Sequence, residues 1–332
     1  MIIKLGVATE ISLPRFVRGG GVIKPILFAA KLVVTVGCFW YVLRKIDVNE
    51  IFKTLPTFDF RWAAFSLVAA LTQIPLLALR LRAVVQTLAQ QPTRLTFLAS
   101  NAVTAICGFF AQVLPGVVSE GIRAWMLTRL GCDWRTGLTS VLIDRGIGLA
   151  VLIIFAFIIF FLPSALNIRA GDQDIVRFVF GGVLLIGVLA LLCAPHIGPM
   201  AQRWHYSYWF GTFTVDAYRV LLGSKAPKIL STSCLSHTLT IVVIWSISHA
   251  QGLSLSLSDC AVVFTMVMGV VLIPISIGGW GLREAAVVSL LSAHGVAREQ
   301  ALLFSLFFGL VFVISALPGG VCLLYAMPAK SD

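Results

Sequence analysis

The stretch LPGVVSEGIRAWMLTRLG, residues 114–131, places a Pro-Gly pair and two charged residues where an apolar membrane span would otherwise continue. Proline removes a backbone donor from a helix, and glycine weakens it. Unpaired backbone groups are tolerated at membrane depth only where they are buried in protein or line a water-filled cavity. The stretch therefore predicts an interrupted helix beside a polar interior.

The sequence around this stretch is strongly apolar. Of 332 residues, 59% are hydrophobic and 12% are charged, with a mean hydropathy of +0.97, whereas soluble domains carry about a quarter charged residues. Runs of about 18 to 20 apolar residues are long enough to cross a bilayer as helices. We predict an all-α polytopic integral membrane protein with about eight transmembrane helices, at about 22–43, 62–89, 95–113, 136–163, 175–194, 228–251, 259–275 and 300–326.

The net charge of +11 follows the loops rather than a single basic face. This pattern favours membrane topology and anionic lipid as its cause, and we expect no nucleic-acid partner. The positive-inside rule assigns residues 1–21 to a cytoplasmic N-terminal segment of a protein of the cytoplasmic (inner) membrane. The basic aromatic linker, about 196–228, is also placed inside, either as an interfacial helix or as a plain loop.

A second segment repeats the order of features in the first. PISIGGWGLREAAVVSLLSAHG, residues 274–295, also runs from proline and glycine through Gly-x-Arg to an apolar helix and a closing glycine. We predict two inverted repeats, about 94–163 and about 257–326, within one transmembrane domain, 22–328, because opposed repeats with interrupted or re-entrant helices are found in transporters. The residues expected to interrupt the helices are Pro115, Gly116, Gly121, Pro274, Gly278, Gly279 and Gly281.

Six charged residues lie in or beside apolar sequence, where each charge costs about 2.5 to 3.5 kcal/mol on insertion scales. Glu120 and Arg123 are spaced to pair on one helix face, whereas the adjacent Asp144 and Arg145 need different partners. Because arginine binds phosphate bidentately, we predict a lipid-headgroup site. Its residues are Glu120, Arg123, Asp144, Arg145, Arg283 and Glu284. The alternative is that these charges form buried ion pairs between the two repeats, or snorkel to an interface.

Motifs for catalysis, nucleotide binding and metal binding are missing from the sequence, and its seven cysteines are scattered. We therefore expect no catalytic residue, no cofactor and no metal. The enzyme alternative is a membrane transferase with Glu120 or Asp144 as general base.

The two segments, together with SVLIDRGIGLAVL and ALLFSLFFGLVFVISALPGG, resemble the transmembrane region of lysylphosphatidylglycerol synthases, a flippase-like family of integral membrane proteins. The resemblance extends over about residues 26–325. Full-length synthases continue into a soluble aminoacyl-transferase domain. We expect this chain to have no such domain, so the resemblance implies lipid translocation rather than synthesis.

The resemblance also implies the substrate and the partners. We expect the chain to flip an anionic or aminoacylated phospholipid, or a related lipid-linked headgroup, without an ATP motif. A homo-oligomer or a lipid-synthesis enzyme is the expected protein partner. The resemblance also implies that a membrane transferase of this kind would act on a polyprenyl-phosphate or hopanoid lipid. The last alternative is an accessory subunit of polyprenyl-phosphate or hopanoid lipid synthesis, whose repeats only form a scaffold for another enzyme.

Overall fold

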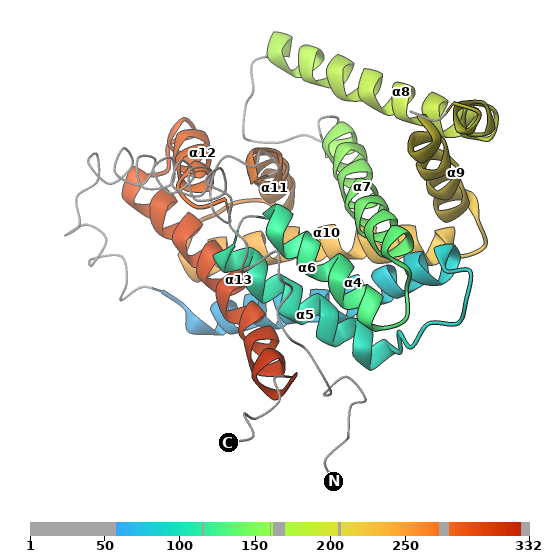
Figure 1. Cartoon of the computed structure of the whole chain (residues 1–332). Helices are drawn as coiled ribbons and strands as arrows, with labels where there is room; N and C mark the ends of the chain where they lie inside the picture. Colours follow the sequence, from blue (N-terminus) through green and yellow to red (C-terminus); the bar gives the residue numbers. More distant parts are fainter. Residues whose placement is uncertain are drawn as a thin grey trace, which may run out of the picture.

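The structure is a computed structural model that describes residues 58–114, 116–159, 161, 170–204, 207–271 and 279–326. All regular secondary structure in these ranges is helical (Figure 1). The helices are α4 (Phe60–Leu88), α5 (Phe97–Val113), α6 (Gly116–Arg129), α7 (Trp134–Ile159), α8 (Ala170–Gln202), α9 (Tyr208–Leu222), α10 (Ala226–Ala250), α11 (Leu257–Val271), α12 (Leu282–Ser292) and α13 (Arg298–Ala326).

Five helices in the described part of the chain are long and apolar enough to cross a membrane: α4, α7, α8, α10 and α13. The apolar helices α5 and α11 are shorter. Side chains cap the starts of α4 and α5, since Asp59 accepts a hydrogen bond from the N–H of Arg61 and Thr96 from the N–H of Ala99. The chain is thus a polytopic α-helical membrane protein, and the span predicted at 22–43 lies outside the described residues.

Helix α8 differs from its predicted span, 175–194. It begins at Ala170 and continues to Gln202, with Pro195 and Pro199 inside it, so it takes up the start of the predicted linker. Further along that linker lies α9, which packs against α8 at the edge of the molecule (Figure 1). Most of the apolar surface of α8 is exposed, as expected for a helix that faces lipid.

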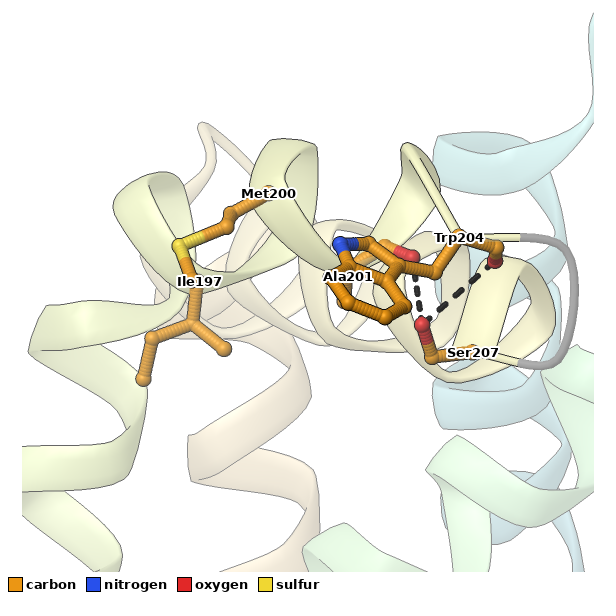
Figure 2. A pocket seen from close by; sticks show the side chains of 5 residues that line it. All are labelled: Ile197, Met200, Ala201, Trp204 and Ser207. Carbon is orange, nitrogen blue, oxygen red and sulfur yellow. Dashed lines mark hydrogen bonds between the residues drawn. The ribbon is translucent and has the colours of Figure 1, made fainter.

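A shallow apolar groove of about 360 Å³ lies at the junction between α8 and α9. Figure 2 shows Ser207 closing it, with its hydroxyl donating to the backbone oxygens of Ala201 and Trp204. Ile197 and Met200 line the α8 side. The groove contains none of the charged residues predicted for the site, so the candidate site lies elsewhere.

Two sets of three helices share one order, a short helix between two longer ones. We call α5–α6–α7 the first copy and α11–α12–α13 the second copy. Each short helix packs against the helix before it and the helix after it. The order matches the two segments singled out in the sequence, but the residues between α11 and α12 at 272–278 lie outside the described residues.

The two short helices end in the same motif. Gly131 and Gly295 have φ values of +95° and +85°, a region that side-chain-bearing residues rarely adopt. The N–H after each glycine bonds back to a leucine carbonyl at 3.1 Å, Leu127 in the first copy and Leu291 in the second. Each glycine N–H bonds one residue further along, which completes a Schellman motif in both copies.

The copies also pack reciprocally. Helix α5, which opens the first copy, packs against α13, which closes the second, and α11 packs against α7 in the same way. At the closest approach, a Cβ atom on Gly319 of α13 would run into the backbone carbonyl of Ala105 on α5. Helices α4 and α10 lie side by side and contact helices of both copies.

Candidate functional site

The centre of the site is a buried ion pair between α4 and α7. Nε of Arg80 donates to Oδ1 of Asp144 at 2.7 Å, and its Nη2 donates to Oδ2 at 2.9 Å. The remaining nitrogen, Nη1, donates to the hydroxyl of Ser233 on α10 at 3.2 Å. Asp144 is 2% exposed, so this bidentate pair connects three helices in the interior.

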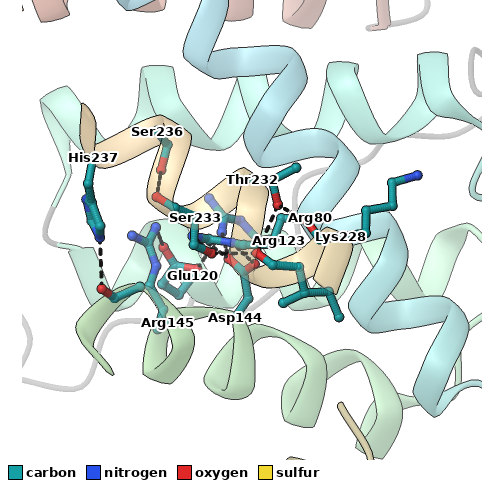
Figure 3. Close-up of polar contacts among 12 residues, drawn as sticks. Arg80, Glu120, Arg123, Asp144, Arg145, Lys228, Thr232, Ser233, Ser236 and His237 are labelled. Carbon is teal, nitrogen blue, oxygen red and sulfur yellow. Dashed lines mark hydrogen bonds and ion pairs between the residues drawn. The ribbon is translucent and has the colours of Figure 1, made fainter. Parts of the chain in front are cut away.

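Helix α6 adds a second pair of charges on one face. Nη1 of Arg123 lies 3.4 Å from Oε2 of Glu120 and 3.5 Å from Oδ2 of Asp144. Glu120 also accepts a short hydrogen bond from Nη2 of Arg145 on α7. Figure 3 shows these side chains converging from α4, α6 and α7 toward Ser233. We call Arg80, Glu120, Arg123, Asp144 and Arg145 the charged cluster.

The charged cluster has an excess of positive charge, with three guanidinium groups against two carboxylates. Arg123 is only 8% exposed, yet its Nε has no hydrogen-bond partner in the described structure. The side chain of Arg145, by contrast, is 54% exposed. The cluster therefore has one positive charge more than its carboxylates balance, and one buried donor without a partner among the described residues.

The depth of the cluster follows from helix geometry. Arg80 lies eight residues before the end of α4, Asp144 ten residues after the start of α7, and Ser233 seven residues after the start of α10. At a rise of 1.5 Å per residue, these positions are about 10 to 15 Å from the nearest helix end. The cluster therefore lies well along three helices, not in a loop.

The second copy contains a separate charge pair. Nε and Nη2 of Arg283 donate to Oε1 of Glu284 at 2.9 and 2.5 Å. The other oxygen of Glu284 accepts from the N–H of Gly281 at 2.5 Å, as a glutamate in the first turn of a helix does in a capping box. The hydroxyl of Ser305 on α13 also donates to Glu284, which is fully buried.

Aromatic rings enclose Arg283. Its guanidinium lies 4.3 Å from the ring centroid of Trp280 and 5.7 Å from that of Phe308. The absence of a side chain at Gly309 leaves room for the guanidinium, because a Cβ atom there would overlap Nη2 of Arg283. The described contacts of Arg283 are thus with Glu284 and these rings.

The structure therefore divides the six predicted residues into two groups. Glu120, Arg123, Asp144 and Arg145 come together, and Asp144 and Arg145 have different partners, as their adjacent positions require. Arg283 and Glu284 pair with each other instead of joining them. Among the residues expected to interrupt the helices, Gly116 begins α6, Gly121 lies inside it, and Gly279 and Gly281 precede α12. Pro115, Pro274 and Gly278 lie outside the described residues.

Sequence reasoning missed Arg80 and Ser233. Arg80 lies near the end of an apolar run, where an arginine usually sets topology, but it is a buried residue of α4. Ser233 belongs to a polar face of α10 that also buries Ser236 and Thr240. The spacing of three to four residues between these hydroxyl groups, in an otherwise apolar span, is the signal that could have identified this face.

Comparison with known proteins identifies one family. The family model described as "Lysylphosphatidylglycerol synthase TM region" matches residues 28–319. This range contains the whole charged cluster, the first copy, and the second copy up to residue 319 of α13. Comparison with curated proteins and with solved structures gave no match.

Proposed function

The chain belongs to the family of the lysylphosphatidylglycerol synthase TM region, and we propose that it is a lipid translocase. Membership in this family indicates a role connected with membrane lipids. The proposed substrate is an anionic or aminoacylated phospholipid, or a related lipid-linked headgroup. The proposed location is the cytoplasmic membrane, where the substrate headgroup crosses between the leaflets.

The charged cluster is the observation that carries this proposal. A site with three guanidinium groups and two carboxylates inside a membrane protein attracts one anion, and arginine matches the geometry of phosphate. Charges at membrane depth are expensive and usually mark a substrate pathway. The half-exposed Arg145 provides an outer contact, and the buried Arg123 provides an inner one.

The reciprocal packing of the two copies supports transport over simple binding. The α5–α13 contact and the α7–α11 contact are interchanged when the copies are exchanged. Related halves that pack in this way can rock against each other, which is how alternating access operates in repeat-built transporters. The charged cluster lies on the first copy and α4, and α4 contacts both copies. We propose that the copies have opposite orientations in the membrane.

Lipid exchange between bilayer leaflets tests the proposal. The purified chain is reconstituted in liposomes with labelled phosphatidylglycerol, lysylphosphatidylglycerol or phosphatidylcholine, and the inner-to-outer exchange of each lipid is measured. We expect faster exchange of the first or second lipid than in protein-free liposomes. Arg145→Gln and Arg123→Gln should slow it about 10- to 100-fold, since each removes a charge-assisted hydrogen bond.

Arg219→Gln is the matched control, because it removes the same charge from an exposed position on α9, where Arg219 lies 3.9 Å from Asp216. This variant should retain the wild-type rate. Equal exchange with and without protein, or full activity in Arg145→Gln and Arg123→Gln, would overturn the proposal. Turnover of a polyprenyl phosphate in the same liposomes would instead favour a membrane transferase.

A further inference from the structure

The sequences of the two copies can be aligned by adding 164 to each residue number of the first copy. This shift takes Gly131 to Gly295 and the start of α7, Trp134, to the start of α13, Arg298. It also takes the fully buried Leu127 to the fully buried Leu291. The shift is therefore set by helix ends and packing rather than by the Gly-x-Arg letters, which are 160 residues apart.

With this shift, the two glutamates become equivalent and the two arginines do not. Glu120 coincides with Glu284, whereas Arg123 coincides with Val287. Arg145 on α7 coincides with Gly309 on α13. The guanidinium of Arg283 occupies the space beside Gly309 on α13 and pairs with Glu284. In the first copy, the guanidinium of Arg145, at the equivalent position of α7, pairs with Glu120.

The two glutamates differ in how firmly they are held. Glu284 is fully buried and accepts hydrogen bonds from Gly281, Arg283 and Ser305, so both of its oxygens are satisfied. Glu120 has one hydrogen bond, from the half-exposed Arg145, and its Oε2 has none. Releasing Glu284 would leave several buried donors without partners. Releasing Glu120 breaks one hydrogen bond, at the accessible Arg145, and the 3.4 Å ion pair of its Oε2 with Nη1 of Arg123, which keeps Asp144 as a partner.

We propose that Glu120 is a displaceable occupant of an anion-binding site formed by Arg123 and Arg145, and that Glu284 permanently fills the equivalent place in the second copy. The incoming anion is a phosphate group, which takes the position of the Glu120 carboxylate. The chain then binds one anion, not two. This inference deepens the proposed function and rests on it.

Calorimetric titration of the full chain in detergent tests this inference. The probes are short-chain phosphatidylglycerol, inorganic phosphate and short-chain diacylglycerol, which has no phosphate. We expect one phosphatidylglycerol per chain. Glu120→Gln should bind it about fivefold more tightly, because a competing carboxylate is gone, and Arg145→Gln should bind it at least about tenfold more weakly. Binding of diacylglycerol should not change in either variant.

Two control variants keep the test decisive. Arg219→Gln repeats the charge change of Arg145→Gln at an exposed site, and Ser305→Ala removes a donor from Glu284. Neither variant should alter the affinity for phosphatidylglycerol or the one molecule of it bound per chain. Two bound anions per chain, or unchanged or weaker binding in Glu120→Gln, would overturn the inference. If free phosphate follows the same variant order, phosphate alone is recognised; if only the lipid binds, the headgroup on its lipid is recognised.

The outcomes also separate this inference from the translocase proposal. The expected binding pattern without any lipid exchange in liposomes would overturn translocation and leave the anion site in place. Exchange that depends on Arg145 but is accompanied by weaker binding in Glu120→Gln would overturn the role of Glu120 alone.

Discussion

Arg80 and Asp144 are 64 residues apart in the chain, yet two hydrogen bonds of 2.7 and 2.9 Å join the guanidinium of one to both carboxylate oxygens of the other. The pair connects α4 to α7 and, through Ser233, to α10. Removing one partner of a buried pair leaves a charge without compensation, which is far more harmful than removing both.

We therefore expect Arg80→Met or Asp144→Leu alone to lower the free energy of unfolding by about 3 to 5 kcal/mol. The double variant Arg80→Met, Asp144→Leu should lose clearly less than the sum of the two single losses. Unfolding of the purified chain in detergent measures this. Asp174→Asn, at an exposed pair with Arg177, is the control and should change stability by about 0 to 1 kcal/mol. Strictly additive losses would contradict the pairing.

Substitution of the two glycines that end the short helices tests the equivalence of the copies. Gly131→Ala and Gly295→Ala should each destabilise the chain by about 1 kcal/mol or more, because both residues have positive φ. The same measurement on Gly146→Ala, inside α7 with open space around it, should show no loss or a small gain. A loss in only one of the two capping glycines would count against a shared motif.

The approach of α13 to α5 predicts opposite effects at two helical glycines. Gly319→Ala should destabilise the chain by about 1 to 3 kcal/mol, because the added Cβ meets the backbone of Ala105, which cannot move aside as a side chain can. Gly108→Ala, on α5 with nothing within 4 Å of the added atom, should stabilise it by up to about 1 kcal/mol. Thermal unfolding in detergent measures the stability change of both variants. Equal changes would contradict a close contact between Gly319 and the backbone of Ala105.

Asp133 predicts a pH dependence outside the membrane spans. Its Oδ2 accepts a hydrogen bond of 2.9 Å from the N–H of Thr136 and so caps the start of α7. Burial raises the pKa of Asp133, but its hydrogen bonds outweigh this and hold the pKa below the usual value. Because the folded pKa is the lower one, the stabilisation is complete above the unfolded value of about 3.9 and is lost as the pH falls through the folded pKa.

Asp133→Ala should therefore cost about 1 kcal/mol at pH 7, and the difference from the wild type should shrink as the pH falls below about 4. Asp133→Asn keeps a capping oxygen without a titrating group, so its stability should lack this pH dependence. A difference between Asp133→Ala and the wild type that stays constant down to pH 3 would contradict the assignment.

Much of the helical layout follows from the sequence alone, because the apolar runs are long and their ends carry clear signals. The predicted span 228–251 corresponds to α10, Ala226–Ala250, and the span 300–326 to α13, Arg298–Ala326. The pairing of Glu120 with Arg123 was also predictable, since both lie on one helix face three residues apart.

The centre of the site was not predictable from spacing. Arg80 meets Asp144 only through the packing of α4 on α7, and no local pattern fixes that contact. An arginine near the end of an apolar run usually serves topology, so the sequence favoured the wrong role for it. The positions of Arg123 and Arg283 were misleading for a related reason: the shared Gly-x-Arg letters suggest an equivalence that the helix ends do not support.

The contact between Gly319 and Ala105 also fixes the order of events during biosynthesis, because its two helices are synthesised at different times. The ribosome makes α5 roughly 200 residues before it makes the part of α13 that covers it. At about 5 to 20 residues per second, α5 waits on the order of 10 to 40 s in the membrane without its main neighbour. During that interval, the face of α5 around Ala105 lacks the helix that covers it in the folded chain, and the first copy reaches its final packing only when the last helix enters the bilayer.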